Sequence, residues 1–549
     1  MLRSSSLVLG LLLNLYVTTQ AETKLNPLFS DGMVLQRDRP VPVWGTAPAG
    51  ERITVEFAGQ NVEATAGDDS TWEAQLLPLP ANAEPQTLVV RGKETITVND
   101  VVVGDVFLAG GQSNMDSPLR SGLAAEALPG AVDPLLRFFT VKKNVAAEPL
   151  AGVDGRWVPT DPENAKDFSA VAYFFARDVR EKEKVPVGII RSAWGGTPIK
   201  TWMSLDSLRL EPPVAAPLKE WEEALAKYKS TKDQPELMEA YYKDMKDWET
   251  NVEPAFKAAR KAHAEAAATA KAAGETPPPP PVPERPEPVM PHPIAMPASS
   301  KRPSVPTISY NAMIAPVAPY ALRGILWYQG EADGSRGPEY RELFPRLIQS
   351  WRQIFRQPEL PFLFVQIPAY GNDPSIVAQK GMPYLRDAQA SALSLPATGM
   401  AVTLDIGEAK DAHPDNKVHV GHRLAIAGRK VVYGEDLVYS GPIYASHQIR
   451  EGKAYVAFSH TGGGLIIGQA PWRAKSMPEA PTDRLVGFAL AGADGKWHAA
   501  DAVIDGDTVL VSSPSVPTPT SVAYGWGDSP SVNLYNQENL PAAPFRVGQ

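Results

Sequence analysis

The chain has 549 residues, of which 44% are hydrophobic and 21% charged, so it is long enough for several packed globular domains. Its formal net charge of −9 argues against nucleic acid or an anionic membrane surface as the main partner. It contains no cysteine, which excludes disulfide bonds, a cysteine nucleophile and a lipid anchor on cysteine.

Residues 1–21 predict a cleaved secretory signal. One basic residue, Arg3, precedes the apolar run Leu7–Leu13, and small residues follow before Glu22. The apolar run is too short for a membrane-spanning helix, which needs about 20 apolar residues. We therefore expect a secreted or periplasmic protein without a membrane anchor after cleavage.

Residues 22–103 predict a small N-terminal β-sandwich. Ile53, Val55 and Phe57 alternate with polar residues, and turn signals such as Asp31-Gly32 separate the runs. We interpret this region as a packing domain, with sugar binding as the alternative.

Residues 104–204 and 305–438 alternate strands with helices. Apolar residues recur at helical spacing within residues 171–179 and 340–351. This order predicts an α/β domain with a mostly parallel sheet, helices on both faces and a ligand site beyond the carboxyl ends of the strands. The predicted strands are Asp105–Ala109, Val185–Arg191, Leu322–Tyr328, Phe362–Ile367 and Met400–Leu404.

Residues 205–304 interrupt the α/β pattern. Helical spacing at 221–248 and an Ala/Lys/Glu-rich stretch at 255–273, closed by Gly274, predict an inserted helical hairpin. Thirteen prolines between Pro277 and Pro306 predict an extended return strap. A passive insertion is our interpretation, and a lid over the site is the alternative.

Residues 439–549 predict a second β-sandwich at the C-terminus. Apolar runs at Tyr455–Phe458, Leu485–Leu490 and Val509–Val511 are separated by glycine-rich turns.

Three predicted strand ends carry the polar residues of a serine hydrolase. The first is Val106-Phe-Leu-Ala-Gly-Gly-Gln-Ser-Asn-Met115, in which two glycines allow a sharp turn that exposes the Ser113 hydroxyl. The others are Gly324-Ile-Leu-Trp-Tyr-Gln-Gly-Glu-Ala-Asp333 and Asp405-Ile-Gly-Glu-Ala-Lys-Asp-Ala-His-Pro414. A serine followed much later by a carboxylate and a histidine is an order that a Ser-His-Asp hydrolase can use.

With these segments the chain resembles the sialate O-acetylesterase family of SGNH-type carbohydrate esterases, from about residue 25 to the end. The resemblance implies an SGNH-hydrolase-like three-layer domain and a serine esterase that removes O-acetyl groups from carbohydrate, sialic acid first, without a cofactor. The similar stretches are Gly111-Gln-Ser-Asn-Met115, Gly195-Gly-Thr-Pro-Ile199, Tyr310-Asn-Ala-Met-Ile-Ala-Pro316, Trp327-Tyr-Gln-Gly-Glu331, His413-Pro414 with Lys417 and Arg423-Leu-Ala425, and Pro541-Ala-Ala-Pro-Phe-Arg546.

The expected catalytic residues are Ser113 as nucleophile and His413 as base. His413 follows a strand beside acidic residues, and Pro414 suits the first turn of a following helix. Many SGNH enzymes place the orienting carboxylate three residues before the histidine, where this chain has Lys410. Asp411 is therefore our choice, with Asp405 and a backbone carbonyl as alternatives.

The oxyanion of an acyl transition state needs hydrogen-bond donors. The Ser113 backbone N–H is one, and the resemblance adds the Gly196 N–H and the Gln329 side-chain amide. Gly196 has turn formation as its alternative role. Glu331 and Asp333 are expected to hold the loop.

Other polar and aromatic residues leave alternatives open. Trp194, Trp202 and Trp327 suit either sugar stacking or core packing. His419 and His422 could form a metal site with His413, but solvated histidines on a helix explain them better, and we expect no metal. The alternative functions are an esterase for acetylated xylan or another polysaccharide, and a non-catalytic carbohydrate-binding protein.

Overall fold

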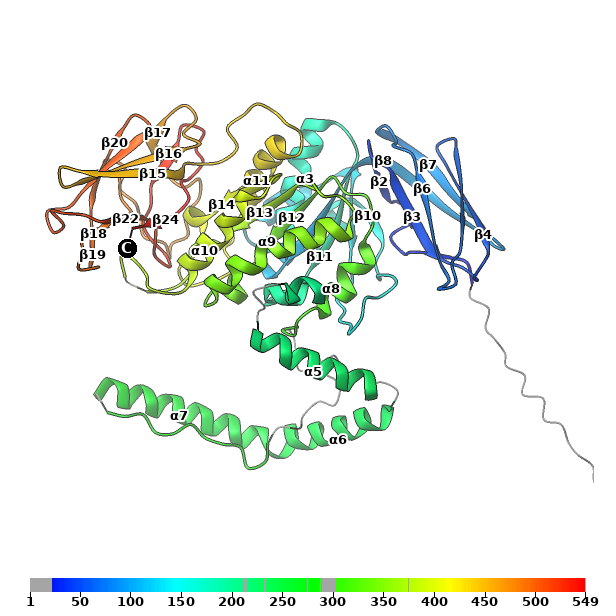
Figure 1. Ribbon diagram of the computed structural model, residues 1–549, viewed down its shortest axis with the longest axis horizontal. Helices are drawn as coiled ribbons and strands as arrows, with labels where there is room; N and C mark the ends of the chain where they lie inside the picture. Colours follow the sequence, from blue (N-terminus) through cyan, green and yellow to red (C-terminus); the bar gives the residue numbers. More distant parts are fainter. Residues whose placement is uncertain are drawn as a thin grey trace, which may run out of the picture.

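The computed structural model describes residues 22–210, 215–231, 234–273, 275–286, 288, 303–373 and 375–548. The predicted signal at 1–21, Gly274 and part of the predicted proline-rich strap lie outside the described residues. The described chain is elongated, with a mixed α/β region in the middle and a β-rich region at each end (Figure 1).

The central sheet has the strand order β10-β9-β11-β8-β12-β13-β14. All neighbouring pairs in it are parallel except β10 with β9, so the predicted mostly parallel sheet is present. Strands β9 and β10 were not predicted, and β14 begins two residues before the predicted Met400. The strands are β8 (Thr95–Gly111), β9 (Asp133–Thr140), β10 (Trp157–Thr160), β11 (Val187–Ala193), β12 (Gly324–Tyr328), β13 (Phe362–Gln366) and β14 (Thr398–Val402).

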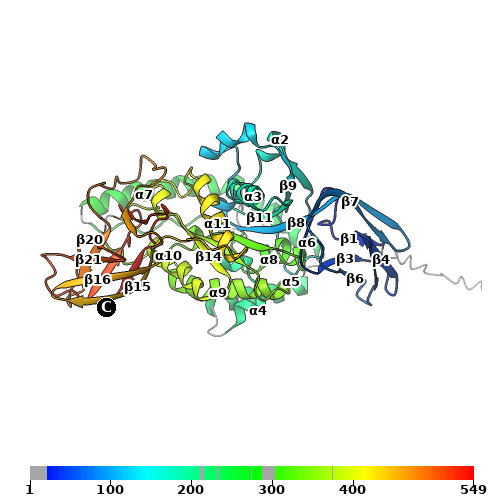
Figure 2. The ribbon, with the colours of Figure 1, turned by 90° about the horizontal axis from the view of Figure 1, so that it is seen from above.

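Helices cover both faces of this sheet (Figure 2). Helices α3 (Ala170–Glu183) and α11 (Val418–Val431) pack on one face, and α9 (Gly337–Ile354) and α10 (Met382–Ala390) on the other. Each helix turns an apolar stripe toward the sheet. Burial of each Phe or Leu side chain in this stripe contributes about 1.5–3 kcal/mol to the free energy of unfolding. The buried side chains include Val171, Phe174 and Phe175 on α3, and Tyr340, Phe344 and Leu347 on α9.

Strand β8 belongs to two regions at once. Its first part pairs with β7 and β2 of the N-terminal region, and its second part pairs with β11 and β12 of the central sheet. The boundary expected between residues 103 and 104 therefore falls inside one continuous strand. The other N-terminal strands are β1 (Lys24–Leu25), β2 (Val34–Gln36), β3 (Val41–Thr46), β4 (Arg52–Phe57), β5 (Gln60–Thr65), β6 (Thr71–Leu76) and β7 (Asn82–Arg91).

The C-terminal region contains two four-stranded sheets, β15-β16-β21-β20 and β19-β18-β22-β24, and the pair β17-β23. Buried Arg386 of α10 ties this region to the central one, because its guanidinium donates to Gly527 O at 2.7 Å and to Asp528 O at 2.8 Å. The strands are β15 (Ile443–Arg450), β16 (Lys453–Ser459), β17 (Leu465–Ile467), β18 (Phe488–Ala491), β19 (Trp497–Ala499), β20 (Asp501–Asp505), β21 (Thr508–Ser512), β22 (Ser521–Tyr524), β23 (Leu534–Asn536) and β24 (Phe545–Val547).

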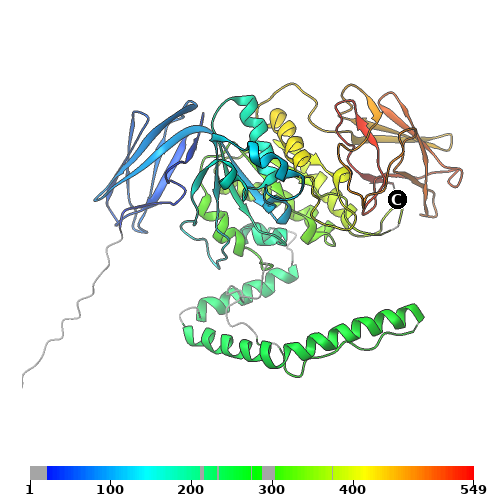
Figure 3. The ribbon, with the colours of Figure 1, turned by 180° about the vertical axis from the view of Figure 1, so that it is seen from behind.

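The insertion forms three helices, of which α5 packs against the central region and α6 and α7 stand away from it (Figures 1 and 3). They are α5 (Ala215–Thr231), α6 (Pro235–Asn251) and α7 (Glu253–Ala273). Trp221 of α5 packs with Ala147 and Ile308 of the central region, and α6 buries its own small apolar cluster. No helix in the described part of the chain is long and apolar enough to cross a membrane.

Candidate active site

The turn after β8 presents Ser113 at the carboxyl edge of the central sheet. Ser113 begins the short helix α1 (Ser113–Asp116). Gly111 has a φ of +137°, and a Cβ on it would lie 2.1 Å from Tyr328 O, so only glycine fits there. The next residue, Gln112, donates its N–H to Tyr328 O at 3.0 Å. The chain therefore turns tightly against β12 immediately before the serine.

His413 lies in the loop between β14 and α11. Its Nε2 is 2.9 Å from Ser113 Oγ, which is hydrogen-bonding distance for removing the hydroxyl proton. Helix α11 begins at Val418, so the prediction that Pro414 lies in the first turn of that helix is wrong. The His413 side chain is 58% exposed, which leaves the pair open to a substrate.

The two candidate orienting carboxylates lie in different surroundings. Asp411 Oδ1 is 3.3 Å from His413 Nδ1 and also accepts the His413 backbone N–H at 2.8 Å. Asp405 is buried, accepts two hydrogen bonds from Arg423 at 2.6 and 2.7 Å, and accepts the Tyr535 hydroxyl at 2.9 Å. Asp411 therefore lies beside the imidazole, whereas the carboxylate of Asp405 is bound by Arg423 and Tyr535.

A cavity of about 380 Å³ opens in front of the serine and histidine. Two carboxylates line it, Asp116 and Asp415, and no lysine or arginine is among its lining residues. Asp116 forms ion pairs with Lys143 at 2.6 Å and with Arg191 at 3.4 Å. The lining residues are Ser113, Asp116, Ser117, Pro118, Ser121, Gly122, His413, Pro414 and Asp415.

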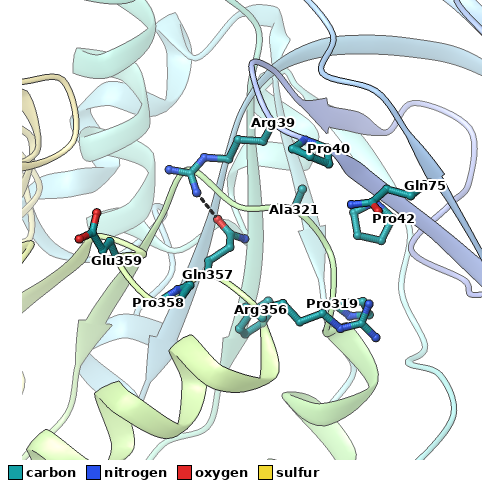
Figure 4. Close-up of a pocket in the computed structure, with 11 residues that line it drawn as sticks. Arg39, Pro40, Pro42, Gln75, Pro319, Ala321, Arg356, Gln357, Pro358 and Glu359 are labelled. Carbon is teal, nitrogen blue, oxygen red and sulfur yellow. Dashed lines mark hydrogen bonds between the residues drawn. The ribbon is translucent and has the colours of Figure 1, made fainter.

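A larger cavity, of about 650 Å³, lies between the N-terminal and central regions (Figure 4). It includes Pro319 and Pro358, which precede β12 and β13, so it lies at the opposite edge of the sheet from Ser113. Arg39 reaches into it and donates to Gln357 at 2.5 Å (Figure 4). Its lining residues include no serine and no histidine. The smaller cavity is therefore the candidate active site.

The glycine turn after β11 lies directly against the nucleophile. A Cβ on Gly195 would be 3.2 Å from Ser113 Cβ, and Gly196 has a φ of +75°. Among the hydrogen bonds of the described residues, none uses the backbone N–H of Ser113 or of Gly196. Both groups remain candidates for binding an oxyanion.

Gln329 is fully buried and does not line the cavity. Its Nε2 donates to Thr197 O at 3.0 Å and to Asp333 Oδ2 at 2.7 Å, which uses both amide hydrogens. To donate to an oxyanion, Gln329 has to release one of these acceptors. Its expected role as donor stays a prediction.

The sequence analysis assigned no role to two polar residues beside the site, Asn114 and Lys417, and expected their neighbour Glu331 only to hold its loop. Asn114 Nδ2 donates to Ala412 O at 2.9 Å and to Glu331 Oε1. Lys417 is 2% exposed, and burial lowers its pKa to about 8. Burial raises the pKa of Glu331. A lone lysine in a polar stretch normally predicts exposure. The one sequence signal for a role of Lys417 at the site was its position shortly after His413 in the motif.

Sugar stacking is the wrong interpretation of Trp202 and Trp327. Both are fully buried and form an edge-to-face cluster with Trp351, so they belong to the core, whereas Trp194 is partly exposed.

The two further histidines have local partners. His419 Nδ1 lies 2.9 Å from Asn416 Oδ1, and His422 Nδ1 pairs with Asp178. Within the described ranges no three His, Asp or Glu side chains are grouped so that they could hold a metal ion.

Comparisons with known proteins show which family the chain is similar to. A family model described as "Carbohydrate esterase, sialic acid-specific acetylesterase" matches residues 103–260 and 301–430. Sialate O-acetylesterase of Rattus norvegicus is 30% identical over 451 residues, covering 75% of this chain and 74% of that protein. The human protein of the same name is 26% identical over 481 residues, covering 80% of this chain and 77% of that protein.

The crystal structure of a carbohydrate acetylesterase from Xanthomonas citri superposes with a TM-score of 0.74 and 34% identity. The match covers 96% of this chain and all of that chain (100%). Together with the family model, which spans more than half of the chain, these likenesses show that the chain belongs to the sialic acid-specific acetylesterase family of carbohydrate esterases.

Proposed function

We propose that this carboxylic ester hydrolase is a serine esterase that removes O-acetyl groups from carbohydrate, with acetylated sialic acid as the first candidate substrate. The observation that carries the proposal is the 2.9 Å contact between Ser113 Oγ and His413 Nε2 at the mouth of a cavity. The names of the rat and human relatives support sialic acid, and that of the Xanthomonas citri protein supports an acetylated carbohydrate.

The reaction follows from the contacts. His413 Nε2 takes the Ser113 proton while Oγ attacks the acetyl carbonyl carbon. The N–H groups of Ser113 and Gly196, and the Gln329 amide once it is released, hold the oxyanion. His413 then protonates the departing sugar oxygen and leaves an acetyl group on Ser113. A water molecule, deprotonated by His413, hydrolyses this ester and releases acetate, while Asp411 keeps the proton on Nδ1.

A second candidate substrate is a neutral acetylated sugar, such as acetylated xylan or another polysaccharide. Sialic acid carries a carboxylate, which is usually bound by arginine or lysine. The cavity is lined instead by Asp116 and Asp415 and by no cation. This lining favours a neutral sugar. A non-catalytic carbohydrate-binding protein is the least supported alternative, because the nucleophile and base are in contact.

We also propose the domain organisation and location expected from the sequence. An SGNH-hydrolase-like domain formed by residues 104–204 and 305–438 carries the insertion 205–304. β-sandwich domains at 22–103 and 439–549 flank it. The strands of the two end regions and the two-sided helical cover of the central sheet support this division. The composition of residues 1–21 supports export to the periplasm or the medium.

Acetate release from a panel of O-acetylated sialic acids and acetylated xylo-oligosaccharides tests the proposal. We expect release from at least one group, abolished by Ser113→Ala with little change in thermal unfolding. Preference for xylo-oligosaccharides would select the second candidate. Binding without acetate release would support the carbohydrate-binding alternative, and full activity of Ser113→Ala would overturn the mechanism.

A further inference from the structure

The backbone on both sides of His413 is held by buried polar side chains. Asn114 Nδ2 donates to Ala412 O at 2.9 Å, and Lys417 Nζ donates to Pro414 O. Asn114 is 0% exposed and Lys417 is 2% exposed. The backbone of His413 is thus held through the carbonyl groups of the residues before and after it, Ala412 and Pro414.

Glu331 accepts a hydrogen bond from Asn114 and acts on Lys417 through its charge. Its Oε1 accepts from Asn114, while its Oε2 is buried and has no hydrogen-bond partner among the described residues. Lys417 is a cation that acts on Glu331 and lowers the pKa of that carboxyl against the effect of burial. Asn114, Glu331 and Lys417 follow β8, β12 and β14 respectively, so they join the three loops that meet at the site.

His413 has little else to fix it. Its side chain is 58% exposed, and the partner carboxylate Asp411 is 57% exposed at 3.3 Å. An ion pair or hydrogen bond that exposed is weakened by competing water and by side-chain motion. Orientation of the imidazole must therefore depend strongly on its backbone.

Burying the charges of Glu331 and Lys417 lowers the stability of the fold, so stability alone does not explain them. A carboxylate and an ammonium taken out of water lose hydration, and apolar side chains of similar volume often stabilise a protein as well or better. The buried ionisable groups of Glu331 and Lys417, on two of the loops at the site, are therefore explained by what they position.

We propose that Asn114, Glu331 and Lys417 are positioning residues that hold the backbone of His413 so that Nε2 stays within reach of Ser113 Oγ. The inference rests on the proposed function, in which Ser113 and His413 carry out the reaction. None of the three side chains lines the cavity, so they act through His413 and not on the substrate.

The charge of Lys417 makes the proposal sensitive to pH. Burial lowers its pKa to about 8, opposed by Glu331, Asp415, Glu408 and Asp411, which all favour the ammonium. Asp333 in turn faces Glu331 and raises the pKa of that carboxyl. Above pH 8 the neutral amine loses its charge-assisted bond to Pro414 O, so kcat should fall as pH rises through this value.

The test compares Glu331→Gln, Lys417→Met and Lys417→Arg in the full chain, with p-nitrophenyl acetate as substrate between pH 6 and 10. Lys410→Met is the matched control, since Lys410 is an exposed lysine of the same loop. Glu331→Gln and Lys417→Met should lower kcat by about 10–100-fold, as expected for a small misplacement of a reacting group, and change KM much less. Lys410→Met should match the wild type.

Lys417→Arg separates positioning from a purely structural role. Arginine keeps the charge at every pH used, so this variant should retain more activity than Lys417→Met and should lose the fall in kcat above pH 8. An unchanged fall in Lys417→Arg overturns the proposal, even if Lys417→Met does not fold. So does a kcat within twofold of wild type for both Glu331→Gln and Lys417→Met. Ser113→Ala in the same panel distinguishes the failures, because activity there would contradict the proposed function instead.

Discussion

Asp411 holds His413 at two points, since its Oδ1 accepts the His413 backbone N–H at 2.8 Å and lies 3.3 Å from Nδ1 of the ring. This arrangement favours the tautomer with a proton on Nδ1 and a free lone pair on Nε2, which faces Ser113. We therefore expect Asp411→Asn to lower kcat by about 10²–10⁴-fold, near the scale of losing the right tautomer, with little change in thermal unfolding. Steady-state kinetics on an acetyl ester measures the loss.

Asp405→Asn is the comparison variant for Asp411→Asn, because Asp405 is the alternative orienting carboxylate. It removes one charge from the buried contact with Arg423 and Tyr535, so it should cost about 3–5 kcal/mol of unfolding free energy in urea. The remaining folded protein should keep kcat within a few-fold. A stable but inactive Asp405→Asn beside an active Asp411→Asn would reverse the assignment of the orienting carboxylate. If both variants are only mildly affected, Ser113 and His413 work as a dyad.

Gly195→Ala should displace the nucleophile. The added methyl group would lie 3.2 Å from Ser113 Cβ, closer than an ordinary van der Waals contact. A shift of a few tenths of an ångström in a reacting atom should lower kcat by about 10-fold. Gly130→Ala is the control, because a Cβ there meets nothing within 4 Å. Equal kcat values for the two variants would mean that the Gly195 turn yields without moving Ser113.

Lys417 should stabilise the fold less at neutral pH than at alkaline pH. Burial lowers its pKa from 10.5 to about 8, so between these values the unfolded chain binds more protons than the folded one. Its contribution to the unfolding free energy must then rise with pH across this window, by at most about 1.4 kcal/mol per pH unit. Urea unfolding of wild type and Lys417→Met from pH 7 to 10 measures the difference. A difference that shrinks with pH would contradict the assigned burial.

Activity should survive exhaustive chelation. The proposed proton transfers run between Ser113, His413 and the substrate, so no step calls for a Lewis acid. Acetate release after dialysis against EDTA should equal that of untreated enzyme. A loss that zinc restores would point to a metal near His413, His419 and His422.

The sequence was most informative where local pattern decides structure. Apolar runs that end in polar glycine turns predicted β8, β12 and the place of Ser113, because burial and turn chemistry depend on neighbouring residues. The strand Asp133–Thr140 escaped because Pro134 and Arg137 break its apolar pattern. Arg137 is accommodated through the Gly32 and Asp100 carbonyls, which lie far away in the sequence.

Pairings between distant segments were beyond the reach of sequence patterns. Nothing in the sequence indicated that Asp405 and Lys417 would be buried. The structure buries Asp405 against Arg423 and Tyr535, and buries Lys417 below the His413 loop. The serine and histidine could be predicted as partners from their order in the chain, but no pattern specifies which backbone carbonyls hold the histidine.

The continuous strand β8 makes the N-terminal region inseparable from catalysis. Seventeen residues, Thr95–Gly111, run without a linker from the edge of that region to the turn that presents Ser113. Removing everything before residue 104 would leave the nucleophile on a shortened strand stripped of its β7 and β2 neighbours. Limited proteolysis should accordingly not release an intact N-terminal fragment, and a hybrid enzyme that borrows this catalytic region must borrow the N-terminal β region with it.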